Sequence, residues 1–258
     1  MLRRNAMLTL VAGLAASATT RAANTQRQSD VVLASGATIH RFTATADDAV
    51  DFTVVRFDAA RCTLRIINQP DRSTATSLAE AMEKSGAIAG VNGGFFTPSF
   101  EPLGLCISQG KRTGNWQRSS LLGGVVMVKK GRPMLLWRDE FQDSPGITEL
   151  VQAGPRLVNN GKPVSGLESR SQRSRTFIAT DNAGHWLLGI CEYTSLAMLA
   201  QLLSTPGLVP GFTVVRALNF DGGKSTGLWA RTATGEVISE AEFTRVKNFV
   251  SIVPRMSS

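Results

Sequence analysis

The chain has 258 residues, a formal net charge of +8 at pH 7, three cysteines and two histidines. That length is typical of one domain, which buries enough surface to fold without a disulfide framework. The excess of Lys and Arg favours an anionic partner, such as a phosphorylated glycan or a lipid headgroup. The sequence has a single tyrosine and does not interleave basic with aromatic residues, so it argues against nucleic acid as that partner.

The N-terminus has the pattern of an export signal. Two arginines precede an apolar run that ends in the small residues Ala16–Ala18, and the run is shorter than the roughly 20 residues that a membrane span needs. We predict a signal peptide over residues 1–18, a flexible polar lead-in over 19–30 and one folded domain over 31–258. The protein would then be periplasmic or secreted, with no stable membrane span after signal cleavage. Sec and twin-arginine export both stay open.

Strands dominate the predicted elements. β-branched and other apolar residues alternate or cluster between turn signals, which is typical of strands. Two segments contain hairpin turns, at Lys130-Gly131 and at Asn160-Gly161. In chain order, the predicted strands lie within residues 31–44, 50–58, 62–69, 87–92, 103–108, 123–137, 155–164, 186–191, 213–220, 226–231 and 248–255.

Two segments change to a helical period. In the first, Ser77 and Glu80 form a capping box and Gly86 supplies the C-terminal stop. In the second, which ends before Pro206, apolar residues recur at i, i+3, i+4 and i+7 from Leu196. No repeat or interdomain linker interrupts the pattern. We therefore predict a single α+β domain with mixed, largely antiparallel sheets flanked by a few helices.

The segment NFDGGKST, residues 219–226, holds the most suggestive carboxylate. Its GGKST is similar to a nucleotide-binding phosphate loop, but the first glycine of that motif would fall at Leu218, and a strand is expected to follow instead of a helix. Asp221 thus ends an apolar strand and precedes two glycines whose backbone N–H groups a ligand can approach. This segment alone supports a ligand-binding aspartate and an aspartate that only caps its own turn equally.

Other candidate groups are arginines and acids. Three arginines fall in one predicted loop, and arginine suits bidentate phosphate contacts, although a solvated basic loop explains Arg170 and Arg173 more simply than Arg175. Glu101 lies among turn and apolar residues, and Glu192 follows an apolar strand, where pockets form. A plain surface acid is the competing interpretation of Glu192.

The sequence lacks the residue patterns of several other enzyme classes and of metal sites. The match of SQGK, residues 108–111, to an acylating-serine motif falls in a turn, where that motif does not belong. No G-x-S-x-G elbow is present, and the two histidines have no second metal-type ligand near them in sequence. The three cysteines match no metal spacing and allow at most one bridge, so we expect them to be buried small side chains.

The chain resembles the phosphodiester glycosidase family in four segments that occur in the family's order. They are GVNGGFFTPSFEPLG, GPRLVNNGK, SRTFIA and LNFDGGKST, within about residues 85–254. That family includes an enzyme that removes N-acetylglucosamine from a phosphodiester, and exported bacterial proteins associated with exopolysaccharide metabolism. The resemblance implies a carbohydrate-active hydrolase that acts on a sugar-1-phosphodiester.

The resemblance also implies a set of site residues. Lys224 departs from it, because the family usually has a third glycine there; a lysine could add a phosphate contact or close part of the pocket. Glu192 is a looser match. The matched positions are Asn92, Gly93, Gly94, Phe95, Glu101, Arg175, Thr176, Asn219, Asp221, Gly222 and Gly223.

The expected reaction explains these residue types. Cleavage of the glycosidic C–O bond passes through an oxocarbenium-like state that a carboxylate stabilises. The departing phosphate is already a good leaving group, so groups that hold it matter more than an acid that protonates it. We predict Asp221 as base or nucleophile, Glu101 as its carboxylate partner, Arg175 as the phosphate anchor, and Asn92 with the flanking glycines as the wall of the sugar site.

No cofactor is expected to be required, although a divalent cation held by Asp221 and Glu101 is left open. The expected partner is a phosphorylated glycan substrate. Two alternatives remain: a non-catalytic envelope protein that binds phosphorylated glycans, and a phosphodiesterase that cleaves the P–O bond. The latter usually needs two metal ions, for which the sequence offers few ligands.

Overall fold

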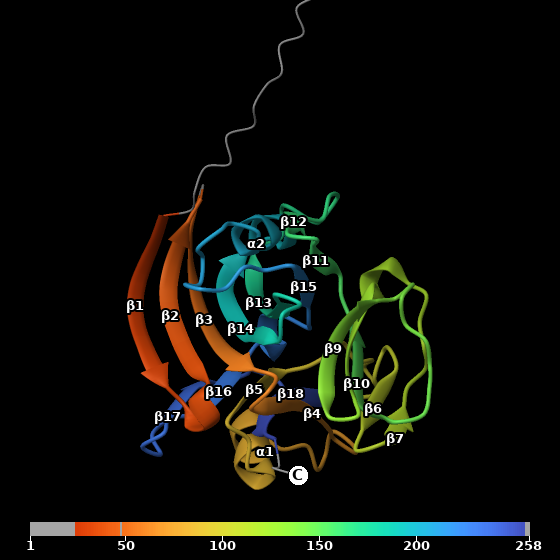
Figure 1. Ribbon diagram of the computed structural model, residues 1–258. Helices are drawn as coiled ribbons and strands as arrows, with labels where there is room; N and C mark the ends of the chain where they lie inside the picture. The colour runs from red at the N-terminus through yellow and green to blue at the C-terminus, as the bar shows by residue number, and fades with distance from the viewer. Residues whose placement is uncertain (1–23, 47, 256–258) are drawn as a thin grey trace, which may run out of the picture.

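The computed structural model describes residues 24–46 and 48–255, which form three antiparallel sheets and two α-helices (Figure 1). The predicted signal peptide lies outside these residues. The α+β class with largely antiparallel sheets is confirmed. None of the helices in the described part of the chain is long and apolar enough to cross a bilayer.

The first sheet carries most of the candidate site. It has eight strands in the order β1 (Asn24–Val32), β2 (Thr38–Thr45), β3 (Ala49–Asp58), β14 (His185–Thr194), β13 (Arg173–Thr180), β15 (Arg216–Asn219), β11 (Arg156–Asn159) and β12 (Lys162–Pro163). Helix α2 (Leu196–Leu203) lies beside β11 and β12 (Figure 1). Hairpin neighbours thus pair with each other, and the contacts of β3 with β14 and of β15 with β11 join distant parts of the sequence.

Two smaller sheets complete the fold. The second has the order β7 (Lys111–Thr113), β6 (Cys106–Ser108), β10 (Ile147–Ala153), β8 (Gly124–Lys129) and β9 (Arg132–Trp137). The third has the order β17 (Val237–Glu240), β16 (Leu228–Arg231), β5 (Ala89–Asn92), β18 (Asn248–Pro254) and β4 (Cys62–Asn68), with α1 (Leu78–Ser85) against it. Short 3₁₀ turns occur at Ala34–Gly36, Ser120–Leu122 and Gly223–Ser225.

The main core lies where the three sheets meet. Phe57 and Trp186 from the first sheet, Trp137 from the second and Ile252 from the third belong to one cluster of buried side chains. A second cluster fills the space between the first sheet and α2, and a third lies under α1. Because apolar residues of the first sheet face both clusters, this sheet is covered on both faces at its centre.

The predicted helices and hairpins are confirmed. The capping box joins Ser77 and Glu80, and Gly86 ends α1 with a φ of 66°, a left-handed conformation that glycine adopts at little cost. Helix α2 lies within the second predicted segment. The turns at Lys130-Gly131 and Asn160-Gly161 join β8 to β9 and β11 to β12. The three cysteines are buried free thiols, as expected.

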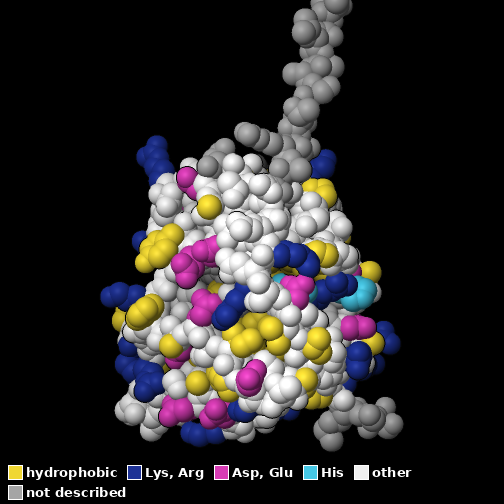
Figure 2. All heavy atoms as spheres, turned by 90° about the vertical axis from the view of Figure 1, so that its left-hand side faces the viewer, with side chains coloured by type: hydrophobic (Ala, Val, Ile, Leu, Met, Phe, Trp, Pro, Cys, Tyr) yellow, Lys and Arg dark blue, Asp and Glu magenta, His cyan; other side chains and the backbone are white. Residues whose placement is uncertain are grey.

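The polar lead-in predicted for residues 19–30 is wrong from Asn24 onwards. Residues 24–32 form β1, which pairs with β2 from Asn24 opposite Thr45 to Val32 opposite Thr38. Most of its side chains are exposed, so backbone hydrogen bonds hold this edge strand while its composition stays polar. Acidic and basic side chains are interleaved on the face turned toward the viewer in Figure 2, the left-hand side of Figure 1, where β1 lies.

Candidate functional site

Asp221 lies where the first sheet meets the third. Strand β15 ends at Asn219, and two residues later the backbone N–H of Asp221 donates to the carbonyl oxygen of Gly93 at 3.0 Å. Gly93 directly follows β5, a strand of the third sheet. The NFDGG and NGG segments, which are far apart in the chain, therefore meet through their backbones.

Asn92 connects three segments of the candidate site. It is 1% exposed, and its side-chain amide donates to the carbonyl oxygen of Asp221 at 2.7 Å. Its Oδ1 accepts from the Thr176 hydroxyl at 2.7 Å and from the Gly227 N–H at 3.2 Å. Every polar atom of this buried side chain thus has a partner, and Asn92 positions Asp221 through the backbone.

The two glycines after Asn92 are packed against Asn248. The N–H of Gly93 donates to the Asn248 carbonyl oxygen, and the N–H of Gly94 donates to Asn248 Oδ1, both at 2.8 Å. A Cβ atom at Gly93 would collide with that same side-chain oxygen. Close packing, and not an unusual φ, therefore requires glycine at this position. Sequence reasoning missed Asn248, whose only signal is an asparagine at the start of an apolar strand.

Burial raises the pKa of the Asp221 carboxyl above its ordinary value. The Ser225 hydroxyl and the Gly222 N–H, which donates to Asp221 Oδ1 at 2.9 Å, favour the ionised form and oppose this shift. Desolvation of the charged form is the larger effect. A partly buried carboxyl with a raised pKa at a strand end is the kind of group that accepts or donates a proton in catalysis.

Arg175 lies beside Gly222. A Cβ atom at Gly222 would lie 3.8 Å from Arg175 Cα and from Arg175 Cδ. Arg175 is 8% exposed; its Nε donates to the Thr194 carbonyl oxygen at 2.9 Å and one Nη2 N–H donates to the Ser171 carbonyl oxygen at 2.5 Å. The guanidinium therefore holds the preceding loop against β14 and still has further N–H donors.

The loop predicted for the three arginines is wrong for two of them. Strand β13 begins at Arg173, so Arg173 and Arg175 lie on a strand, and only Arg170 stays in the loop. The β-branched and aromatic run that follows Arg175 pairs with both β14 and β15, and this pairing extends back into the basic residues. The strand is what fixes Arg175 next to the Asp221 segment.

Thr176 and Asn219 connect β13 and the GPRLVNNGK segment to the segment that contains Asp221. The carbonyl oxygen of Thr176 accepts from the Phe220 N–H at 2.8 Å. The Asn219 side-chain amide donates to the Gly154 carbonyl oxygen at 3.0 Å, and its backbone N–H donates to the Pro155 carbonyl oxygen at 3.1 Å. All four segments singled out in the sequence are thereby brought together.

The segment after Asp221 is not a nucleotide phosphate loop. Gly223–Ser225 forms a single 3₁₀ turn, and the strand β16 follows at Leu228, as the sequence predicts. Gly223 has a φ of 63°, which explains a glycine there. Lys224 is exposed, and its carbonyl oxygen accepts from the N–H of Phe243, which anchors the turn to the loop after β17.

Glu101 and Glu192 take no part in the hydrogen bonds described so far for this cluster. Glu101 is exposed and lines a hollow of about 340 Å³ that also contains Lys111 and Lys247. Glu192 is exposed on β14 and lines another hollow of about 210 Å³ with Arg41. Within residues 24–46 and 48–255, no hydrogen bond joins either acid to Asp221. Their predicted roles stay predictions.

Within the same ranges, no group of three or more His, Cys, Asp or Glu side chains is placed to hold a metal ion. The need for a divalent ion stays a matter for measurement.

We expect Glu101→Gln to lower kcat by about tenfold or less, well below the effect of changing Asp221, because an exposed carboxyl without a contact to Asp221 adds little to a preorganised site. Steady-state rates on a sugar-1-phosphodiester, with Glu83→Gln as an exposed control, would check this. A loss of a hundredfold or more would instead place Glu101 beside Asp221 when substrate is bound.

Comparison with known proteins places the chain in a family and shows proteins of similar fold. The family model described as phosphodiester glycosidase matches residues 85–253. No curated protein sequence matches. The catalytic domain of zebrafish N-acetylglucosamine-1-phosphodiester alpha-N-acetylglucosaminidase, auto-inhibited by its pro-peptide, has a similar fold, with a TM-score of 0.60 and 16% identity over 93% of this chain and 86% of that one.

A hypothetical protein from Synechocystis is similar in fold to the same degree, with a TM-score of 0.60 and 18% identity, over 85% of this chain and 62% of that one. At such identities these structures establish the fold alone. The family model covers well over half of the chain and includes Asn92, Arg175 and Asp221. The chain therefore belongs to the phosphodiester glycosidase family.

Proposed function

We propose that this protein is an exported hydrolase that cleaves the glycosidic C–O bond of a sugar-1-phosphodiester in an envelope or extracellular glycan. One observation carries the proposal: Asp221, whose carboxyl is partly buried, is held through its backbone by Asn92 and Gly93, and the next residue, Gly222, lies against Arg175. A carboxylate and a guanidinium are the two groups that this reaction needs, one for the sugar and one for the phosphate.

Asp221 acts in this proposal as the base or nucleophile at the anomeric carbon. Its ionised oxygens would stabilise positive charge as the C–O bond breaks, and water would complete the reaction. Burial disfavours the charged Asp221 carboxylate before substrate binds. Positive charge that develops on the sugar in the transition state would offset this desolvation of the carboxylate.

Arg175 anchors the departing phosphate in this proposal. Its hydrogen bonds to Thr194 and Ser171 fix the guanidinium plane, and Glu168 lies 3.8 Å from Nη2. Among the described residues, neither Nη1 N–H group has a hydrogen-bond partner. A guanidinium held in this way contacts an anionic oxygen with little further loss of side-chain entropy. Lys224, exposed in the turn after Asp221, is the second cation that could contact the phosphate.

We propose Glu101 or Glu192 as the second carboxylate, the partner of Asp221. Glu101 is the residue matched to the family, and Glu192 is the other acid assigned to the site. Either would have to approach Asp221 once substrate is bound. If neither does, the phosphate leaves without a protein acid, which its low basicity allows.

The decisive experiment is hydrolysis of an α-N-acetylglucosaminyl phosphodiester in ¹⁸O-labelled water, with the label located by mass spectrometry. Label in the released sugar is the expected result and establishes C–O cleavage. Label in the phosphate would instead show P–O cleavage by a phosphodiesterase. Repeating the assay with a chelator tests the need for a divalent cation, and fractionating the producing cells tests export to the periplasm or the medium.

A non-catalytic protein that binds phosphorylated glycans is the second candidate. Two observations favour it: two N–H donors of Arg175 are already occupied, and no second carboxyl is hydrogen-bonded to Asp221 within the described ranges. Saturable binding of a phosphorylated glycan, with no turnover over a panel of sugar phosphodiesters, would favour this function over hydrolysis.

A further inference from the structure

The hollow that contains Glu101 lies between the second and third sheets. It has a volume of about 340 Å³, and Asn68, at the end of β4, faces the β6–β7 hairpin across it. The Asn68 side-chain amide donates to the Thr113 hydroxyl at 3.2 Å, and the Ser108 hydroxyl donates to the Ile66 carbonyl oxygen at 2.6 Å. Polar side chains of both sheets therefore share this hollow, whose volume is within the roughly 300 to 1,000 Å³ of small-molecule sites.

Lys247 brings a buried charge to this hollow. It is 2% exposed, directly precedes β18 and lines the hollow. Its Nζ donates to the Pro70 carbonyl oxygen at 2.9 Å and lies 5.3 Å from the centre of the Phe100 ring. Among the described residues, Lys247 forms no salt bridge. Because a lysine is rarely this buried without a charged partner, its ammonium lacks a counter-ion.

The other charged groups around the hollow leave it positive. Lys111, exposed on β7, also lines it, and Arg72 lies over the same aromatic ring as Lys247, at 5.0 Å. Glu101 is an exposed acid on the wall. Glu149, a buried acid of β10, already accepts two backbone N–H groups, at 2.8 and 3.3 Å. This excess of positive charge favours an anionic ligand.

The wall of the hollow also contains an unsatisfied acceptor. Asn68 Oδ1 is buried and has no hydrogen-bond partner among the described residues. Buried polar atoms are satisfied in the great majority of cases, so this acceptor calls for a donor. A ligand that brings hydroxyl groups together with an anionic group matches this lining.

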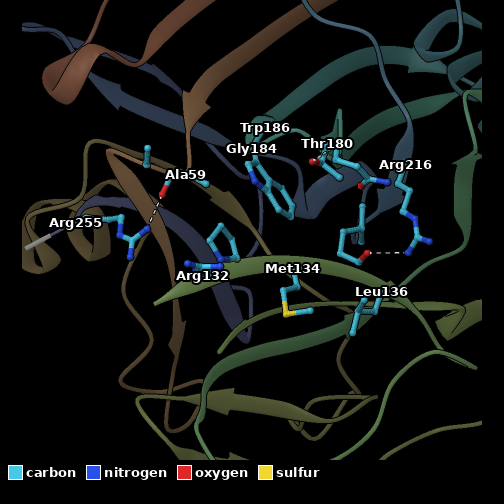
Figure 3. A pocket seen from close by; sticks show the side chains of 13 residues that line it. Ala59, Arg132, Met134, Leu136, Thr180, Gly184, Trp186, Arg216 and Arg255 are labelled. Carbon is cyan, nitrogen blue, oxygen red and sulfur yellow. Dashed lines mark hydrogen bonds between the residues drawn. The ribbon is translucent and has the colours of Figure 1, made fainter. Parts of the chain in front are cut away.

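In a wider hollow at the edge of β9, of about 620 Å³, the charged groups are already satisfied (Figure 3). Arg132 and Arg255 are exposed there, so water solvates their charges. Glu140 accepts two N–H groups of Arg216, at 2.6 and 2.8 Å. A cation in water needs no ligand to balance it, whereas the buried ammonium of Lys247 does. The hollow beside Glu101 is therefore the better candidate for an anion site.

We propose that the hollow beside Glu101 binds a phosphorylated sugar unit whose phosphate contacts Lys247 and Lys111. The hydroxyl groups of the sugar face the polar wall of Asn68 and Thr113. This assignment rests on the proposed function, because the unit would belong to the same glycan that is cleaved at Asp221. The hollow would thus select glycans that carry a second phosphate beside the one that departs.

The hollow is connected to the Asp221 segment through β18. Lys247 precedes Asn248, whose carbonyl oxygen accepts from the Gly93 N–H at 2.8 Å, and the Gly93 carbonyl oxygen accepts from the Asp221 N–H at 3.0 Å. Consecutive Cα atoms are about 3.8 Å apart and those of hydrogen-bonded partners about 5.5 Å, so the Cα atoms of Lys247 and Asp221 lie within roughly 15 Å of each other. A glycan of a few sugar units spans this distance.

Calorimetric titration of the full chain with glucose 6-phosphate tests the hollow without relying on turnover. We expect saturable binding that Lys247→Met weakens by about tenfold or more, because charge-assisted hydrogen bonds to the phosphate are lost. Lys111→Gln should weaken it by about threefold or more, a smaller effect because that ammonium stays in water. Lys162→Gln, which removes an exposed lysine of β12, is the matched control and should leave the affinity unchanged.

Lys247→Met should fold as well as the wild type. It removes a buried charge at similar side-chain length, and Pro70, whose carbonyl oxygen loses a donor, is an exposed residue. If the melting temperature of this variant is nevertheless lower, Lys111→Gln and Lys162→Gln decide the matter, because both change exposed residues. Equal affinities in these two variants would then overturn the proposal.

Other calorimetric results would also count against the proposal. No saturable binding, or equal weakening by Lys162→Gln, would mean that the hollow is not a site for this ligand. Glucose binding as tightly as glucose 6-phosphate would remove the role of the phosphate. Inorganic phosphate binding as tightly as glucose 6-phosphate would indicate an adventitious ion only.

Nuclear magnetic resonance of the ¹⁵N-labelled chain locates the bound probe. We expect glucose 6-phosphate to shift the backbone amide signals of Asn68, Ser108 and Thr113. Shifts confined to residues 222–225 would instead place the phosphate at the hydrolase site, which would overturn this proposal and leave the proposed function standing. Binding in the hollow without any hydrolysis in the ¹⁸O assay would support the sugar-phosphate site and remove the hydrolase.

Discussion

Asp221→Asn should lower kcat on a sugar-1-phosphodiester by about 10²- to 10⁴-fold while leaving the fold intact. The amide has nearly the shape of the carboxyl, and its oxygen can still accept the Gly222 N–H. It cannot become an anion or form a glycosyl ester. Steady-state kinetics beside Asp139→Asn, an exposed aspartate, would check the effect. Full activity in Asp221→Asn would remove Asp221 from the mechanism.

The same change should raise stability at neutral pH. Burial raises the pKa of Asp221 in the folded protein above its value in the unfolded chain, so the native state binds the proton more tightly. Stability is then lost as pH rises from the unfolded-state pKa, about 3.9, through the raised native value. The asparagine variant avoids that loss at pH 7 but gains nothing near pH 3, where the carboxyl is protonated in both states.

Thermal unfolding of wild type and Asp221→Asn at pH 7 and pH 3 measures this difference. A variant that is inactive and yet more stable at pH 7 separates a chemical role from a structural one. In the wild type, kcat/KM plotted against pH should fall on the acidic side with an apparent pKa above 3.8, the ordinary value of an aspartate carboxyl. A lower melting temperature in the variant at pH 7 would mean that the carboxylate is stabilised by its surroundings instead.

Asn92→Ala should destabilise the protein by about 3 kcal/mol or more. It leaves the Asp221 carbonyl and the Gly227 N–H without their side-chain partner in a buried place, and the Thr176 hydroxyl keeps only a 3.4 Å contact to the Thr226 hydroxyl. Each unsatisfied group costs roughly 1 to 3 kcal/mol. Activity should fall by about a hundredfold, since Asp221 loses one of the bonds that position it. Urea unfolding and single-turnover rates would measure the two effects.

Thr176 supplies the matched comparison. Thr176→Val removes one hydroxyl at nearly constant volume and should cost about 1 to 2 kcal/mol, because Asn92 Oδ1 keeps its bond to Gly227. Thr176→Ser keeps the hydroxyl and should stay close to wild type in activity. If Asn92→Ala were no more harmful than Thr176→Val, the bond from Asn92 to the Asp221 backbone would not be what positions the carboxyl.

Short sequence patterns predicted the helix ends and the hairpin turns. The capping box at Ser77, the glycine stop at Gly86 and the two hairpin turns depend on residues within a few positions of one another. The order of the matched motifs likewise singled out Asn92, Arg175 and Asp221 as candidates, and the fold brings their segments together. What the sequence misjudged were segments whose state depends on a distant partner: residues 24–30 pair with β2, and Arg173 and Arg175 pair with β14.

The amino-acid sequence was enough to predict the α+β class, the helices, most of the strands and the motif residues, because periodicity and turn chemistry depend on residues a few positions apart. Three features depend on the tertiary fold: Asn248 packs against Gly93 and Gly94, Glu101 lines a hollow with Lys111, and Gly222 lies against Arg175. Each of these depends on how strands distant in the chain meet in the sheets, which no local pattern specifies.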